Sequence, residues 1–370
     1  MIGLYLSKLA AGAAGALIAV AVAAVPGDTV ALSGVAAVLQ GRVAPAVQPH
    51  RTMLLSIARA GNRLVAVGEH GTIALSDDNG AKWRNAAGVP VDATLTAVRF
   101  ADERNGWAVG HLGVVLHTRD GGENWTRQLD GIAIGKLAMV QVQGQTTTLE
   151  EAKRLADDGP DKPLLDLLVE DAKRVTVVGA FNLALSTVDG GATWQLISHQ
   201  FDNPEHLHLY GIARVGRSVV AVGEQSLVLR RSGDRFVPVK SPYEGSLFGV
   251  VSTGERLLVV FGLRGHAFMS LDGGANWQAS KLPGTGASLN GALRLAHGRI
   301  VLYDQAGGVF ASADGGVRFE RVPFDWGAPI TGMVEAADGS LVATSVVGIT
   351  QIPKTALAAP MAAAGAGALR

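Results

Sequence analysis

The chain has 370 residues, of which 48 are glycine and none is cysteine, and its 32 basic side chains balance 32 acidic ones. The missing cysteine excludes a disulfide scaffold, a thiolate metal site and a cysteine nucleophile. The zero net charge argues against a nucleic-acid partner, because such binding depends on neutralising phosphates. Hydrophobic residues make up 48% of the chain, which is enough for a large core, and the abundant glycine predicts a turn-rich, all-β protein.

The first 25 residues read as a signal peptide or an N-terminal anchor. Lys8 precedes an uncharged stretch from Leu9 to Val25, which is followed by Pro26 and Gly27. One positive residue, an apolar centre and small residues near its end are typical of a secretory signal. The stretch is shorter than the roughly 20 residues of a membrane span, but an uncleaved anchor stays open. Both interpretations predict a periplasmic or otherwise extracytoplasmic protein, with residues 26–40 as a linker.

A motif of the form S/T-x-D-x-G-x-x-W recurs along the chain. The acidic and closing aromatic residues of its copies are Asp78 and Trp83, Asp120 and Trp125, Asp189 and Trp194, Asp272 and Trp277, and Asp314 and Phe319. Phe236 closes a decayed copy. Successive closing aromatics are separated by 42, 69, 42, 41 and 42 residues, as read from their positions. A nearly constant spacing with one long interval indicates a repeat fold with a single insertion.

Each motif follows two short strand-like runs, such as Leu64–Gly68 and Thr72–Ser76 before the first copy. A third run, such as Leu95–Phe100, lies upstream in each repeat, and a fourth begins at the closing aromatic. Four antiparallel strands in about 42 residues predict one blade of a β-propeller. We therefore expect an all-β, seven-bladed propeller of four-stranded antiparallel blades over residues 41–354, followed by a low-complexity tail at 355–370.

Two irregular segments complete the predicted fold. The last repeat ends at its third strand, so we expect residues 41–48 to supply the fourth strand and close the ring. The insertion covers about residues 135–164, between blades 2 and 3. Within it, Thr147 stands three residues before Glu150, an arrangement typical of a helix start. We expect one helix over Leu149–Asp157, across or beside the mouth of the propeller.

The regular Asp motifs are interpreted as structural turns, and each supplies a single carboxylate, so no metal site is expected there. The opposite face collects the hairpins between second and third strands and the connections between blades. Its polar and aromatic residues vary from blade to blade, as on a binding surface, although solvated turns are the simpler alternative. The residues predicted to bind a partner are Glu69, His70, His111, Tyr210, Glu224, Tyr243, Arg264, His266 and Trp326.

Catalytic chemistry finds little support in the sequence. A glycosidase needs two facing carboxylates, and Glu69, Glu224, Asp304 and Asp325 are candidates by position alone. His206-x-His208 would point to opposite faces of a strand, so only a loop could make it a metal site. We predict no catalytic residue, no metal and no cofactor.

The segment Gly106–Trp125, GWAVGHLGVVLHTRDGGENW, resembles a typical blade of the photosystem II stability/assembly-factor family. The segments at residues 161–167, 201–212 and 241–250 resemble its proteobacterial members, and the likeness extends over about residues 52–352. The resemblance implies a non-enzymatic assembly factor or scaffold that binds a membrane-protein complex outside the cytoplasm. The photosynthetic members of this family use an arginine-rich surface, and in this chain only Arg264 lies in a blade loop that resembles it.

The partner implied by the resemblance is photosystem II or another envelope complex, such as a membrane transporter, and the protein itself is expected to be a monomer. The alternative is a glycan-active hydrolase of the Asp-motif propeller class. A central pocket with two carboxylates roughly 5–10 Å apart would favour the hydrolase. A broad, partly aromatic surface would favour the scaffold.

Overall fold

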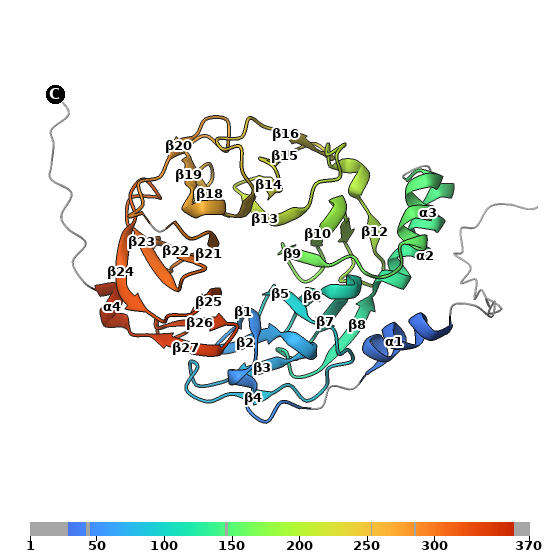
Figure 1. Cartoon of the computed structure of the whole chain (residues 1–370), viewed down its shortest axis with the longest axis horizontal. Helices are drawn as coiled ribbons and strands as arrows, with labels where there is room; N and C mark the ends of the chain where they lie inside the picture. The colour runs from blue at the N-terminus through green and yellow to red at the C-terminus, as the bar shows by residue number, and fades with distance from the viewer. Residues whose placement is uncertain (1–28, 42–44, 145–146, 253, 285, 359–370) are drawn as a thin grey trace, which may run out of the picture.

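A computed structural model describes residues 29–41, 45–144, 147–252, 254–284 and 286–358. In these ranges the strands form seven antiparallel sheets that surround a central axis (Figure 1). Six sheets have four strands and the seventh has three. The predicted seven-bladed propeller is confirmed, with the last blade incomplete.

The first strand of each blade lies next to the central axis, and the other strands follow outward in chain order (Figure 1). The inner strands are β1 (Leu54–Ala60), β5 (Leu95–Phe100), β9 (Leu164–Val169), β13 (Leu209–Val215), β17 (Leu247–Ser252), β21 (Leu289–Arg294) and β25 (Ile330–Glu335). The second strands are β2 (Arg63–Gly68), β6 (Gly106–Gly110), β10 (Val175–Gly179), β14 (Ser218–Gly223), β18 (Leu258–Gly262), β22 (Ile300–Asp304) and β26 (Leu341–Ser345).

The third strands are β3 (Ile73–Ser76), β7 (Val115–Thr118), β11 (Ala184–Thr187), β15 (Val228–Ser232), β19 (Ala267–Ser270), β23 (Gly308–Ser312) and β27 (Gly348–Ile352). The outer strands are β4 (Arg84–Asn85), β8 (Trp125–Leu129), β12 (Gln195–Leu196), β16 (Arg235–Pro238), β20 (Gln278–Ala279) and β24 (Glu320–Asp325). The α-helices are α1 (Thr29–Gln40), α2 (Gly131–Gln143), α3 (Leu149–Asp157) and α4 (Lys354–Ala358). The 3₁₀ turns are η1 (Pro49–Arg51), η2 (Glu69–Gly71), η3 (His111–Gly113), η4 (Ala180–Asn182), η5 (Ser198–Gln200) and η6 (Leu263–Gly265).

The glycine that ends most second strands is fixed by a close approach of backbones. A Cβ atom added at Gly68 would lie 2.0 Å from the carbonyl oxygen of Met53, which precedes the inner strand of the same blade. At Gly110 the corresponding distance to the Thr94 oxygen would be 2.2 Å. No other residue fits there, which explains the repeated V-G ending of these runs.

Apolar packing between neighbouring blades makes up the core. Each of the seven buried clusters joins residues of two adjacent blades, and together they include every blade-to-blade interface. In six of them the closing aromatic of an Asp motif packs against the preceding blade. Trp125 lies in the cluster between blades 1 and 2, and Trp194 in the one between blades 2 and 3. The motif therefore acts as an interlock between blades.

The depth of this packing varies around the ring. Trp125, Trp194, Phe236 and Phe319 are buried, whereas the rings of Trp83 and Trp277 are partly exposed. Trp83 joins blades 7 and 1, and Trp277 joins blades 4 and 5. The closing aromatics are therefore deeply buried at some interfaces and partly exposed at others.

The expected closing strand is not formed by the described part of residues 41–48. Gly41 and residues 45–48 carry no strand, and residues 42–44 lie outside the described residues. The seventh sheet ends at β27, and η1 packs against β27 instead. The ring is closed by packing between β1 and β25, because inner strands of neighbouring blades lie in contact all around the axis.

The first residues of the expected low-complexity tail, 355–358, are helical. They form α4, whose Ala356 and Leu357 pack against the cluster between blades 6 and 7. Arg299 donates a hydrogen bond of 2.8 Å to the carbonyl oxygen of Leu357. Blade 7 has no Asp motif, so α4 supplies the apolar contact that a closing aromatic supplies elsewhere.

Residues at the N-terminal side also differ from expectation. The proposed signal peptide or anchor at residues 1–25 lies outside the described residues. Much of the expected linker is helical, because Thr29–Gln40 forms α1. Leu39 of this helix is buried, in a cluster with Val91 and Trp125. No helix in the described ranges is long and apolar enough to span a membrane.

The insertion forms two helices rather than one. The predicted helix over Leu149–Asp157 is confirmed as α3, but its N-cap is Thr148, which accepts a hydrogen bond from Glu151 N, and not the expected Thr147. The preceding residues form α2, which the sequence analysis did not predict. Its N-cap is Asp130, whose carboxylate accepts a hydrogen bond from Ala133 N.

The two helices pack against each other at the outer rim, next to β12, and do not cross the central opening (Figure 1). Gln141 of α2 both donates to and accepts from the backbone of Leu196 in β12, at 3.1 and 2.7 Å. Its side-chain amide thus takes the place of a neighbouring strand on this edge. Ala152 and Leu155 of α3 are buried in the same cluster as Trp194.

We predict that Trp125→Ala lowers the free energy of unfolding by about 3–5 kcal/mol, because the indole is deeply buried between two blades. Its Nε1 also loses a hydrogen bond of 2.8 Å to the carbonyl oxygen of Gly122. Trp83→Ala should cost less, because its ring is partly exposed. Urea unfolding measures both, with the exposed Val188→Ala as a control within another motif. Equal losses at Trp125 and Trp83 would contradict the interlock.

Candidate functional site: the hairpin face

The hairpins between second and third strands share one turn geometry in blades 1 to 5. Each turn places two consecutive residues in the left-handed region, as a type I′ turn requires. The pairs are His70–Gly71, Leu112–Gly113, Phe181–Asn182, Gln225–Ser226 and Arg264–Gly265, with φ between 47° and 75°. In blade 1 the turn is closed by a hydrogen bond of 2.8 Å from Thr72 N to the carbonyl oxygen of Glu69. We call the face formed by these five turns the hairpin face.

The first residue of each pair is not a glycine, although glycine or asparagine fits this conformation best. A larger side chain in the left-handed region costs about 1–2 kcal/mol. His70, Phe181, Gln225 and Arg264 are exposed, so burial in the core does not offset that cost. Strained residues that project into solvent are typical of positions kept for contact with a ligand or partner.

Two of the predicted residues hold the backbone instead of reaching into solvent. Glu69 accepts a hydrogen bond of 3.0 Å from Met53 N, and Glu224 accepts one of 3.2 Å from His208 N. Met53 and His208 each precede an inner strand, so the two carboxylates do the same structural work in blades 1 and 4.

A row of aromatic rings crosses the hairpin face over blades 3 to 5. Phe181 meets His208 edge-on at 4.6 Å between ring centroids, and His208 lies 6.0 Å from Tyr210. Tyr210 in turn meets Phe248 edge-on at 5.5 Å. Nδ1 of His208 accepts a hydrogen bond from Phe181 N at 3.0 Å. Burial, followed by the nearby carboxylate of Glu224, raises the pKa of the Tyr210 hydroxyl above its ordinary value.

A second aromatic group lies beside this row. Tyr243 stacks on His266 with centroids 4.5 Å apart, and both lie near Phe268. Arg264 is exposed at the tip of the adjacent turn, where its backbone N–H donates to Ser288 Oγ at 3.2 Å. Of the predicted residues, Tyr210, Glu224, Tyr243, Arg264 and His266 therefore gather over blades 4 and 5.

The remaining predicted residues lie apart from this group. His70, on blade 1, places its Nδ1 3.0 Å from the Asp92 carboxylate, and His111 is exposed on blade 2. Trp326 is partly buried against the cluster between blades 6 and 7.

The helix α3 packs at the rim, so the prediction that it lies across or beside the mouth of the propeller is wrong.

The opposite face carries the Asp motifs, and their carboxylates are used within the motif. In blade 3, Asp189 accepts hydrogen bonds from the hydroxyl and the backbone N–H of Thr193, at 2.6 and 2.9 Å, and from Thr187 Oγ1 at 2.8 Å. These bonds lower the pKa of Asp189 from 3.8 to about 2. No group of three or more potential metal ligands occurs in the described part of the chain.

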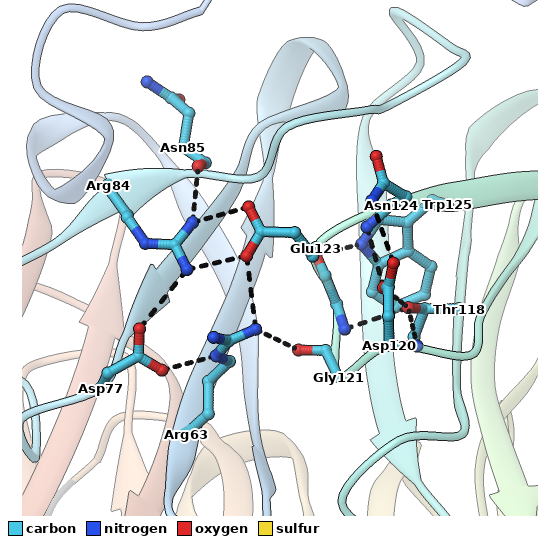
Figure 2. A network of polar contacts seen from close by, with 11 residues as sticks. Arg63, Asp77, Arg84, Asn85, Thr118, Asp120, Gly121, Glu123, Asn124 and Trp125 are labelled. Atoms are coloured by element: carbon cyan, nitrogen blue, oxygen red, sulfur yellow. Dashed lines mark hydrogen bonds and ion pairs between the residues drawn. The ribbon is translucent and has the colours of Figure 1, made fainter.

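An ion-pair network ties blades 1 and 2 together on that opposite face (Figure 2). Arg84 binds both oxygens of Glu123, at 2.8 and 2.7 Å, and Arg63 binds Asp77 at 2.6 Å. Arg63 also reaches Glu123 at 3.4 Å. The hydrogen bond from Arg84 lowers the pKa of Glu123 below its ordinary 4.5. These charges bind each other, so the network stabilises the fold and offers a partner little unpaired charge.

The inner strands contribute a site that the sequence analysis missed. Each of the seven blades has a β-bulge between its first and second strands. The bulge turns one residue of the inner strand toward the central opening. These residues are Leu55, Thr96, Leu165, Tyr210, Phe248, Asn290 and Thr331, and all of them line a central cavity of about 360 Å³. The signal was present as a repeated Leu/Ile-x-small pattern, such as LYG at residues 209–211 and LFG at 247–249.

The geometry defines a seven-bladed propeller with Asp-motif interlocks and a partly aromatic hairpin face. A family model described as photosynthesis system II assembly factor YCF48 matches residues 59–150, which include strands of blades 1 and 2. Photosystem II assembly lipoprotein Ycf48 from Synechococcus sp. (strain CC9902) is 24% identical over an alignment of 237 residues that covers 57% of this chain and 70% of that protein. These matches confirm the resemblance to the photosystem II assembly-factor family.

Solved structures of similar shape agree in fold. The structure of YCF48 bound to D1 peptide has a TM-score of 0.59 at 16% identity and covers 83% of this chain and 93% of that one. YCF48 from Cyanidioschyzon merolae has a TM-score of 0.62 at 14% identity and covers 84% and 99%. A streptogramin B lyase structure has a TM-score of 0.60 at 11% identity, with 83% and 95% covered. Assembly factors and an enzyme thus share this architecture, and the fold alone does not assign a function.

We predict that Glu123→Gln lowers stability at pH 7 by about 0.2–1 kcal/mol per lost ion pair, since the network is partly exposed. The folded pKa is depressed, so the stabilisation is present above pH 4.5 and is lost as pH falls through the folded pKa. The gap between variant and parent should therefore close in acid. Thermal unfolding from pH 7 to pH 3 measures it, with the exposed Glu205→Gln as a charge-matched control. A pH-independent gap would show that packing is responsible.

Proposed function

We propose that this chain is a non-enzymatic assembly factor or scaffold that binds a membrane-protein complex through its hairpin face. The observation that carries the proposal is the set of exposed, strained side chains at equivalent turns, above all Phe181 and Arg264. The rest of the fold holds these turns in their strained conformation, and their exposed side chains are available for contact with a partner. Aromatic and arginine side chains are the types that dominate protein–protein contacts.

The resemblance supplies the class of partner. One structural neighbour is described as YCF48 bound to D1 peptide, and the relative from Synechococcus is a photosystem II assembly lipoprotein. We propose that the partner here is likewise a segment of a photosystem II subunit or of another membrane-protein complex. A location outside the cytoplasm follows from the apolar segment at residues 9–25 and is part of the proposal.

The hydrolase alternative finds less support. Of the four acids that could have served it, Asp325 has a side chain outside the described part of the structure, and Glu69 and Glu224 bind backbone N–H groups of their own blades. Asp304 is buried and accepts hydrogen bonds from Ala306 N and Gly308 N. Asp166 is the one carboxylate among the residues that line the central cavity, and Arg99 pairs with it at 3.1 Å. The paired free carboxylates that glycoside hydrolysis requires are thus not found among these described residues.

We predict that Phe181→Gly and Arg264→Gly weaken partner binding without weakening the fold. Glycine relieves the left-handed strain, so each variant should keep or gain stability, by up to about 1 kcal/mol. Partner contact is measured by photocrosslinking in membranes of the source organism, with the crosslinker at residue 264 for the Phe181→Gly variant and at residue 181 for the Arg264→Gly variant. D1 peptide binding to the purified protein is measured separately and tests the photosystem client.

The matched control is Asn79→Gly, which changes a left-handed residue in an Asp motif on the opposite face. Crosslinkers at Lys82 and Arg318, on that face, should capture no membrane protein. Capture from Lys82 or Arg318 but not from residue 181 would show that the working face is wrongly assigned. Capture from residue 181 without D1 binding would remove photosystem II as the client and leave the scaffold.

A further inference from the structure

The seven bulge residues form a ring at the opening of the central cavity on the hairpin side. Each follows a completely buried Leu or Ile, such as Leu209 before Tyr210 and Leu247 before Phe248, which fixes the strand beneath it. The inner strands begin next to the hairpin turns, because Leu54 pairs with Gly68 and Leu209 pairs with Gly223. Because the inner strands surround the central axis (Figure 1), the ring lies around that axis on the hairpin side.

Apart from Leu55 on blade 1, the ring is polar on one side and apolar on the other. Its polar members are already engaged between blades: Thr96 Oγ1 donates to Leu164 O at 2.6 Å, and Thr331 Oγ1 donates to Leu54 O at 2.6 Å. Asn290 Nδ2 donates to the carbonyl oxygen of Ile330 at 2.9 Å. These side chains join neighbouring blades at the mouth, which accounts for their presence without any ligand.

Leu165, Tyr210 and Phe248, on the consecutive blades 3, 4 and 5, form an apolar arc that has no such role. All three are partly exposed, although the free energy falls when an apolar side chain is removed from water. Phe248 meets Tyr210 edge-on, so two rings already form part of an aromatic wall. The aromatic row from Phe181 leads across the hairpin face to this wall.

The cavity beneath the ring carries no net charge. Arg99 and Asp166 are the charged residues among those that line it, and they bind each other across blades 2 and 3. Asp166 is further bound by Ile212 N at 3.1 Å, and Arg99 donates to Ser56 Oγ at 3.3 Å. A charged ligand would have to break this pair, whereas an uncharged one would not.

The volume sets the size of the ligand. About 360 Å³ lies near the lower end of the roughly 300–1,000 Å³ found for small-molecule sites. It accommodates one or two side chains and is too small for a helix or a folded segment. Aromatic pockets at the centre of an interface commonly hold such an anchoring side chain.

We propose that the mouth of the central cavity is an anchor pocket for one uncharged aromatic side chain of the partner, held against Leu165, Tyr210 and Phe248. The inference rests on the proposed function for the identity of the partner, but not for the existence of the pocket. Binding there would remove the apolar arc from water and leave the Arg99–Asp166 pair intact.

The test uses N-acetyl-tryptophanamide as the probe and the full chain as the protein. Titration calorimetry should detect weak binding, and methyl NMR shifts should locate it at Leu55 and Leu165. Phe248→Ala should weaken binding about tenfold, because it removes one ring of an aromatic pair. Leu165→Trp should abolish it by filling the mouth. Leu271→Ala, which removes an exposed apolar side chain in an Asp motif on the opposite face, should leave probe affinity unchanged, and melting temperatures confirm that each variant is folded.

Three results would overturn the pocket. They are no binding of the amide probe, binding that Phe248→Ala and Leu165→Trp both leave unchanged, and tighter binding of N-acetyl-tryptophan, whose carboxylate would instead indicate anion recognition by Arg99. The crosslinking experiment separates this proposal from the proposed function. Probe binding without capture of a partner would retain the pocket and remove the scaffold role, and capture without probe binding would do the reverse.

Discussion

Apolar contact between neighbouring blades is the interaction on which this structure depends. A blade of four short strands has two faces and cannot bury either of them alone, so every blade is stabilised by the next. The seven clusters each lie between two blades, and in six of them the aromatic that closes an Asp motif reaches the preceding blade. The Asp carboxylate orders the turn that holds this aromatic, as the bonds of Asp189 show. Each copy of the motif therefore does the same thing, which is to hold an aromatic side chain against the preceding blade.

The incomplete seventh blade shows how the same constraint is met without the motif. Blade 7 has three strands and no closing aromatic, and α4 supplies Ala356 and Leu357 to the interface with blade 6. At the other end, α1 places Leu39 next to Trp125, and at the insertion Gln141 satisfies the backbone of the short strand β12. Helices outside the repeat thus cover the places where the repeat leaves apolar surface or strand edges exposed.

The features that suggest function are departures from the repeat rather than parts of it. The turn positions of the hairpin face share one strained conformation, but their side chains differ, from His70 to Phe181 to Arg264. The residues of the ring at the central cavity all stand at equivalent bulges. Their side chains nevertheless change from threonine and asparagine to tyrosine and phenylalanine. In both sets the backbone is constant and the side chain is free to vary, which is how a structural frame can acquire a specific binding surface. On the Asp-motif face, by contrast, Arg63 and Arg84 both form ion pairs with Glu123.

The sequence alone determined the architecture, because a period of about 42 residues with an aromatic at its end permits few other folds. It also determined α3, since a capping threonine and helix formers are local signals. It did not determine α2, whose apolar residues lack a clear period, or the roles of Glu69 and Glu224, which depend on backbone N–H groups about 16 residues away. Only the tertiary structure decided that the insertion lies at the rim, that α4 replaces a motif, and that Tyr210 and Phe248 meet at a central opening. Those results arise from contacts between blades, and residues far apart in sequence are brought together only when the ring closes.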